Sequence, residues 1–184
     1  LTEEYTRTNT GPVRKGLGVA CLSYASGTYP VCLEIAGSRI VLNQDGTVHV
    51  MVGATEIGQG SDTVVAQMTA QTLGLPYADV RVVQAQDTDV SPFDTGAYAS
   101  RQAYVVSNAV YRAAAEFKEK LLAHAAMMTH LNAGDLDIID GKIVDTNNKS
   151  MIMGMKELAV DAFYHKERGG QITAEVSYKT TTNA

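Results

Sequence analysis

Gly53-Ala54-Thr55-Glu56-Ile57-Gly58-Gln59-Gly60 decides how this sequence folds, because it joins a strand pattern to a helix pattern. Upstream, apolar residues alternate with His49 and Met51, which predicts a strand that runs into Gly53. Downstream, an apolar-periodic run predicts a helix over 61–73, and Gly74-Leu75-Pro76 supplies its stop signal. The stretch therefore predicts a strand, a glycine-rich loop and a helix start in direct succession.

A glycine-rich loop at a helix start suits an anion such as phosphate. The first backbone N–H groups of a helix have no partner within it, and the helix dipole places positive charge at the same end. Gly58 and Gly60 carry no Cβ, so a ligand can approach the backbone closely. The spacing matches neither G-x-G-x-x-G nor a P-loop. A purely structural strand-to-helix turn is therefore the alternative that the motif leaves open.

Length and composition are those of an ordinary globular protein. The chain has 184 residues, of which 45% are hydrophobic, a net charge of −5 and a pI near 5.3, which fits one large domain or two small ones. The acidic balance argues against nucleic acid and anionic membranes as partners. No apolar run is long enough to span a membrane, and Cys21 and Cys32 lack metal-type spacing. We expect both cysteines to be reduced core residues of a cytoplasmic protein.

The two ends of the sequence differ from its middle. Residues 1–15 are polar and show no period, which predicts an arm or linker ahead of a domain over 16–184. The first residue is Leu rather than Met, and 180–184 follow a strand pattern without a closing element. These features predict an internal piece of a longer polypeptide.

The remaining patterns predict an α+β (mixed α/β) fold, in which a mixed sheet carries one long and two shorter helices. The long helix is expected at about 102–131, after the helix over 61–73 and before a short one over 155–163. Extended patterns cover 17–21, 31–35, 38–42, 47–52, 80–83, 136–144 and 172–178. The first two of these are expected to form a hairpin-like pair.

A loop of unusual length, 86–101, precedes the long helix. Long ordered loops in compact domains are commonly functional, and small residues before this helix again bring backbone N–H groups to a helix start. Tyr98 has two interpretations: an exposed ring that stacks on a flat heterocycle, or a half-buried ring that closes the loop against the sheet. Asp87, Asp89 and Asp94 lack the pattern of a calcium-binding loop, so we expect turn and capping roles for them.

Residues that could carry catalysis or hold a metal are not evident. The four histidines are spread without metal-ligand spacing. No serine sits in a nucleophile elbow, and Ser100-Arg101 has no evident base partner. We therefore predict no catalytic residue and no protein-ligated metal in this chain.

Two segments make the sequence resemble the molybdenum-binding subunits of the xanthine dehydrogenase and aldehyde oxidase family. The first is 53–60, which follows Asp45-Gly46-Thr47-Val48 and fits G-[AG]-T-x-[IM]-G-Q-G. The second is Asp94-Thr95-Gly96-Ala97-Tyr98-Ala99-Ser100-Arg101, which contains T-G-x-x-x-S-R. The similarity spans most of 16–184 and is closest in character to bacterial xanthine dehydrogenases.

The resemblance implies a molybdopterin-binding subdomain, with molybdenum and with the pterin in its plain or dinucleotide form. Gln59 matches the family glutamine that touches the cofactor, and the second segment matches one in which backbone amides dominate the contacts. The cofactor-binding residues that the match implies are Ile57, Gly58, Gln59, Gly60, Ala97, Tyr98, Ala99, Ser100, Arg101 and Gln102.

Departures from the family pattern limit what this piece is expected to do. The family's glutamate base and the glycine-rich segment beside the metal's oxo group match nothing here, and no cysteine clusters suit iron–sulfur centres. The resemblance implies three partners: the rest of the molybdenum subunit, an FAD module and an iron–sulfur module.

The intact protein would oxidise a small molecule, either a xanthine- or hypoxanthine-type purine in purine metabolism or an aldehyde, and this piece alone would be inactive. A non-catalytic anion- or protein-binding domain with the same loops is the alternative.

Overall fold

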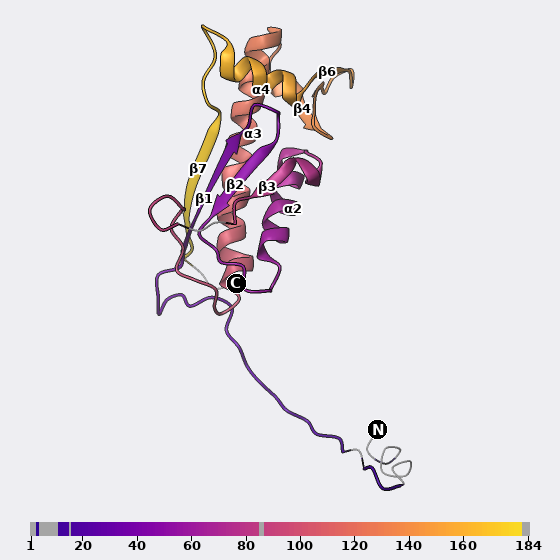
Figure 1. Cartoon of the computed structure of the whole chain (residues 1–184), viewed down its shortest axis with the longest axis vertical. Coiled ribbons are helices and arrows are strands. Elements are labelled where there is room, and N and C mark those ends of the chain that lie inside the picture. Colours follow the sequence, from indigo (N-terminus) through magenta and orange to yellow (C-terminus); the bar gives the residue numbers. More distant parts are fainter. Residues whose placement is uncertain (1–2, 4–10, 15, 85–86, 182–184) are drawn as a thin grey trace.

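A four-stranded mixed sheet lies at the centre of the molecule (Figure 1). The structure, a computed structural model, describes residues 3, 11–14, 16–84 and 87–181. The sheet has the order β3-β2-β1-β7. Its strands are β1 (Ile35–Leu42), β2 (Val48–Val52), β3 (Val80–Val82) and β7 (Thr173–Lys179). β1 is antiparallel to both neighbours, whereas β2 and β3 are parallel, which confirms the expected mixed sheet.

The β1–β2 hairpin delivers the chain to the glycine-rich stretch. Its turn is closed by Asp45, whose Oδ1 accepts hydrogen bonds from the backbone N and the hydroxyl of Thr47 at 2.9 and 2.6 Å. Alternate residues of both strands are buried, so the period-2 pattern in the sequence marks the face that meets the helices. The buried set is Ile40, Leu42, Val48, Val50 and Val52.

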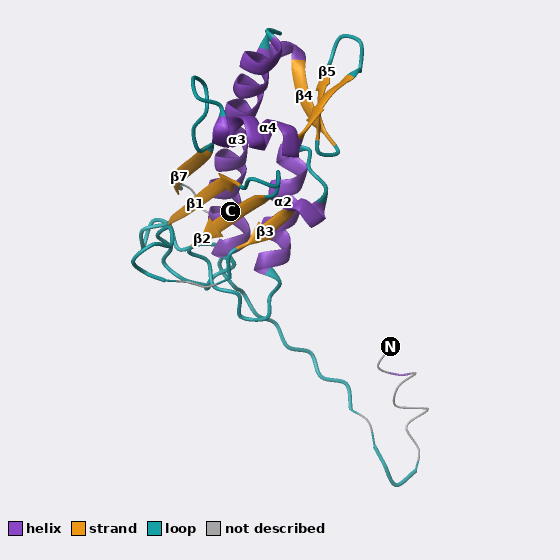
Figure 2. Ribbon diagram, turned by 45° about the horizontal axis from the view of Figure 1, so that its top comes forward, coloured by secondary structure: helices purple, strands orange, loops and turns teal. Residues whose placement is uncertain are grey.

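Helices cover one face of this sheet (Figure 2). α3 (Ser107–Thr129) packs across β1 and β7, and α2 (Ser61–Leu73) packs beside α3. A π-helical turn, η2 (Gln102–Val106), leads into α3, so the expected long helix exists but starts with a wider turn. α4 (Met155–Tyr164) matches the third expected helix.

The end of α2 explains its stop signal. Gly74 has φ 78° and its N–H donates to the carbonyl of Ala70 at 2.9 Å. A Cβ on Gly74 would lie 1.9 Å from the carbonyl oxygen of Ile138, so only glycine fits both the conformation and the close approach.

A second, antiparallel sheet has the order β4-β5-β6. Its strands are β4 (Leu136–Ile139), β5 (Lys142–Asp145) and β6 (Met151–Gly154), with single turns η1 (Tyr77–Asp79) and η3 (Ala133–Asp135) at the connections. The hairpin expected over 136–144 is confirmed, whereas β6 has no sequence prediction. Ile143 and Leu158 are fully buried, which joins this sheet and α4 to the main core.

The hairpin-like pair expected over 17–21 and 31–35 is wrong. Residues 16–34 form no strand: the first part of this segment extends away from the body (Figure 1), whereas Gly27 and Glu34 are buried against it. Val19 and Leu22 are 88% and 90% exposed, because their alternating pattern has no partner strand here. Cys21 and Cys32 are also exposed, so the expectation of core cysteines is wrong as well. Most of the predicted arm over 1–15 lies outside the described residues, and the boundary at 15 stays a prediction.

Within the described ranges, no helix is long and apolar enough to cross a membrane.

Candidate functional site

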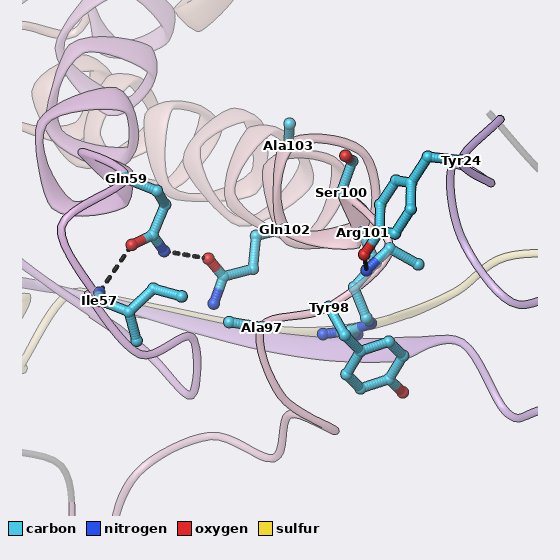
Figure 3. Close-up of a pocket in the computed structure, with 10 residues that line it drawn as sticks. Tyr24, Ile57, Gln59, Ala97, Tyr98, Ser100, Arg101, Gln102 and Ala103 are labelled. Atoms are coloured by element: carbon cyan, nitrogen blue, oxygen red, sulfur yellow. Dashed lines mark hydrogen bonds between the residues drawn. The ribbon is translucent and has the colours of Figure 1, made fainter. Parts of the chain in front are cut away.

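Two loops that are distant in sequence line one cavity at the end of the molecule where α2 and η2 begin (Figures 2 and 3). The first loop (53–60) follows β2, and the second loop (94–102) ends at Gln102, the first residue of η2. The cavity has a volume of about 360 Å³ and is open on one side. Its lining consists of Tyr24, Ile57, Gln59, Ala97, Tyr98, Ala99, Ser100, Arg101, Gln102 and Ala103. Of the ten residues predicted from sequence, eight meet here; Gly58 and Gly60 lie in the first loop but do not line the cavity.

Gln59 and Gln102 connect the two loops directly. Nε2 of Gln59 donates to Oε1 of Gln102, and both side chains donate to the carbonyl of Thr55, at 3.0 Å from Gln59 and 3.2 Å from Gln102. Oε1 of Gln59 accepts from the backbone N–H of Ile57 at 2.6 Å. Figure 3 shows the two amides facing one another. The two loops therefore meet at one edge of the molecule.

The start of α2 differs from the expectation that its backbone N–H groups face a ligand. Oε1 of Glu56 accepts from Gly58 N at 2.7 Å and from Gly60 N at 3.0 Å, and Oε2 accepts from Asp62 N at 3.1 Å. The hydrogen bond from Gly60 N, followed by that from Asp62 N, lowers the pKa of Glu56 to about 2. A side chain of the loop itself therefore supplies the anion, which the sequence pattern did not indicate.

The buried side chain of Arg101 ties the second loop to the segment that leads into β1. Its Nε donates to Oε2 of Glu34 at 2.8 Å, and one terminal nitrogen donates to Oδ1 of Asp94 and to the carbonyl of Gly96 at 2.7 and 2.8 Å. The other terminal nitrogen donates to the carbonyl of Ile35 at 2.6 Å. The side chain is fully buried, so its guanidinium offers nothing to a ligand while these bonds hold.

Gly37 in β1 and Gly53, directly after β2, let the long loop over 86–101 approach the sheet. A Cβ on Gly53 would lie 2.2 Å from the carbonyl oxygen of Pro92, and one on Gly37 would lie 2.7 Å from Pro92 Cβ. Gly37 N also donates to the carbonyl of Phe93 at 2.8 Å. These contacts press the loop against the ends of β1 and β2.

The turn before η2 has an unusual backbone. Ala99 and Ser100 have φ of 46° and 53°, a region that residues with a Cβ rarely adopt. Ala99 N donates to the hydroxyl of Tyr24 at 2.8 Å, and its carbonyl accepts from Gly27 N at 2.6 Å. No local pattern points to Tyr24, because its role depends on a contact 75 residues away.

Tyr98 remains compatible with both of its interpretations. It is 39% exposed and lines the cavity, while its hydroxyl donates to the Thr95 hydroxyl at 3.1 Å. Its ring also lies over the guanidinium of Arg101, with 5.6 Å between Cζ and the ring centroid.

Asp87 and Asp94 in the long loop have the expected turn roles. Asp87 Oδ1 accepts from Asp89 N at 2.9 Å, and Asp94 Oδ1 accepts from Gly96 N at 2.7 Å. In the described part of the chain, no group of three or more His, Cys, Asp or Glu side chains is arranged to hold a metal ion.

Known proteins with the same pattern are molybdenum-containing enzymes. The family model for the molybdopterin cofactor-binding domain matches residues 1–184. Over 174 residues the chain is 58% identical to a putative xanthine dehydrogenase molybdenum-binding subunit of Escherichia coli, which covers 94% of the chain and 23% of that protein. It is 38% identical over 129 residues to a probable hypoxanthine oxidase of the same species, covering 70% of the chain and 13% of that protein. The chain thus spans less than a quarter of these relatives.

Solved structures show the same fold. The crystal structure of quinoline 2-oxidoreductase from Pseudomonas putida matches with a TM-score of 0.73 and 25% identity, over 84% of this chain and 20% of that one. Reconstituted CO dehydrogenase from Oligotropha carboxidovorans matches with a TM-score of 0.69 and 27% identity, over 80% of this chain and 18% of that one.

Proposed function

Because the chain belongs to the molybdopterin cofactor-binding domain family, we propose that its two loops hold part of a molybdenum–pterin cofactor within a molybdenum hydroxylase. The observation that carries the proposal is the Gln59–Gln102 contact, which joins both predicted loops at the mouth of one cavity. The residues proposed to line the cofactor are Ile57, Gln59, Ala97, Tyr98, Ala99, Ser100, Arg101 and Gln102, with Gly58 and Gly60 shaping the first loop.

The polar groups of the cavity fit a pterin. A pterin ring presents donors and acceptors side by side along its edge, and a carboxamide offers the same pair. The internal bonds use both N–H groups of Gln59 and one lone pair of its Oε1, so Gln59 keeps one acceptor site. Gln102 uses one N–H group and one lone pair, so it keeps one donor and one acceptor site for a ligand. The exposed hydroxyl of Ser100 and the ring of Tyr98 add a polar contact and a flat surface.

The chemistry divides between the cofactor and the chain. The bound molybdenum centre would supply the redox step, in its plain or dinucleotide pterin form. The two loops would bind and orient it. Neither loop contributes an acidic side chain to the cavity lining, so the proton acceptor for substrate oxidation would come from another part of the intact protein.

The relatives favour a purine as the substrate, since the two Escherichia coli proteins are named for xanthine and hypoxanthine. Aldehydes are the second candidate class, because an aldehyde oxidoreductase subunit of Escherichia coli is also similar, at 28% identity. The proposal includes FAD and iron–sulfur modules as partners and a cytoplasmic location. The chain by itself would be inactive.

The test is the molybdenum and pterin content of the intact purified protein, together with its oxidation of xanthine, hypoxanthine and an aldehyde by an artificial acceptor. We expect stoichiometric molybdenum and faster turnover of the purines. A protein with neither molybdenum nor pterin would favour a non-catalytic anion- or protein-binding domain. Turnover by the 184-residue chain alone would contradict the proposed division of roles.

A further inference from the structure

The carboxylate of Glu56 collects the hydrogen-bond donors at the start of α2. Oε1 accepts from Gly58 N and Gly60 N, and Oε2 accepts from Asp62 N and from the hydroxyl of Ser61 at 3.2 Å. Gly60, the N-cap residue, has no side chain to cap the helix. Glu56 therefore takes over the capping of a helix whose N-cap residue lies four positions after it.

This arrangement closes the helix start to an outside anion. A carboxylate that accepts several backbone N–H bonds at the positive end of a helix stays ionised, and the pKa of Glu56 lies near 2 as a result. A phosphate would have to displace a charged group that is tethered next to its donors. The glycine-rich first loop is accordingly shaped by its own anion, and its glycines serve the positive φ of Gly58 and Gly60, 97° and 84°.

The same arrangement determines where Gln59 points. Its neighbours on both sides, Gly58 and Gly60, donate their N–H groups to Glu56, so the backbone at Gln59 is held from two sides. The Gln59 side chain bonds to Ile57 N and to Gln102 instead. Without the carboxylate, Gly58 N and Gly60 N lose their acceptor, and the two positive-φ glycines have many alternative conformations.

We infer that Glu56 is a positioning residue for the cofactor site: its carboxylate caps α2 as an internal anion and thereby orients Gln59 across the cavity toward Gln102. The inference rests on the proposed function, since it assigns a role in the same site. Glu56 itself does not line the cavity.

The first test is hydrogen exchange of the segment 57–62 in the intact protein, measured by mass spectrometry on Glu56→Ala, Glu56→Gln and a control. Glu56→Ala should exchange about tenfold faster in this segment, as expected for the loss of charge-assisted bonds. Glu56→Gln keeps one acceptor oxygen, so its exchange rate in this segment should lie between those of the wild type and Glu56→Ala. The control is Asp62→Ala, which removes an equal charge from the same helix turn but leaves the Asp62 N–H on Glu56.

The second test asks whether Glu56 acts through Gln59. Molybdenum retained after dialysis is compared for Glu56→Ala, Gln59→Ala and the double variant. Each single variant should retain several-fold less molybdenum than the wild type, and the double variant little less than Gln59→Ala alone, because both changes remove one contact.

Three results would overturn the inference: unchanged exchange in Glu56→Ala, equal acceleration in Asp62→Ala, or fully additive molybdenum losses. A wild-type protein without molybdenum would instead refute the proposed function, and the exchange experiment would still decide whether Glu56 holds the loop.

Discussion

Nε of Arg101 lies 2.8 Å from Oε2 of Glu34, and neither side chain is exposed to solvent. A second carboxylate, that of Asp94, lies 2.7 Å from the same guanidinium. The family resemblance implied Arg101 as a cofactor contact, but its charge is already matched by these two acids. We therefore regard Arg101 as the anchor of the second loop, and only its backbone as a part of the cavity wall.

Arg101→Ala should destabilise the protein by about 3–5 kcal/mol, because it leaves Glu34 and Asp94 buried without their cation. The measurement is urea unfolding. The control is Arg39→Ala, which breaks a pair with Glu175 whose side chains are 40% and 54% exposed, so a loss of at most about 1 kcal/mol is expected. Equal losses for both variants would show that the buried network contributes no more than a surface pair.

Gln59→Ala and Gln102→Ala should each weaken cofactor retention modestly, by roughly 0.5–1.5 kcal/mol for a neutral hydrogen bond. Since the two amides contact each other, their effects should be non-additive in a double-mutant cycle. The readout is the molybdenum content after stepwise dilution. Independent effects would mean that the two loops bind separately.

Gly60→Val should lower both stability and molybdenum content. A Cβ at Gly60 meets no atom within 4 Å, so the expected loss of about 1–2 kcal/mol or more comes from its φ of 84°. Gly154→Val is the matched control, because Gly154 also caps a helix, also faces open space, and has φ −89°. Molybdenum content equal to wild type in Gly60→Val would remove the first loop from the cofactor site.

Acid should weaken the end of the molecule opposite to the cavity. Hydrogen bonds from Arg168, and further from His124, lower the pKa of Asp161 to about 2 from its usual 3.8. The stabilisation is thus present above about pH 4 and is lost as the pH falls toward 2. Asp161→Asn should flatten the pH dependence of the melting temperature in this window. Asp140→Asn, at an exposed turn, is the control and should leave the curve unchanged.

The local patterns of the sequence predicted local structure well. The helix over 61–73 was confirmed at both ends, since the apolar period and the stop at Gly74 are encoded within a few residues. The long helix was confirmed except for its π-helical first turn, which the periodicity does not reveal. The two loops meet because each precedes a helix that packs on the same sheet.

Features that depend on distant partners could not be predicted in this way. The alternation over 17–21 is typical of a strand, but a strand also needs a partner strand, and the local pattern does not show whether one is present. Arg101 and Glu34 are 67 positions apart, so the burial of Arg101 had no local signal. Glu56 was visible in the first loop, yet only the folded backbone shows that its carboxylate turns back onto the glycines.

The pairing of β1 with β7 also determines the order in which the strands of the sheet can pair during synthesis. During synthesis, β1 can join β2 as soon as the hairpin leaves the ribosome, but its other edge stays open until Thr173–Lys179 emerges. Contacts across such a separation form slowly, because a long loop must close first. Until then, Ile35–Leu42 presents an unpaired strand edge on which another nascent chain could add. The yield of folded protein should therefore depend on the rate of translation and on chaperones, because β1 is protected only once β7 pairs with it.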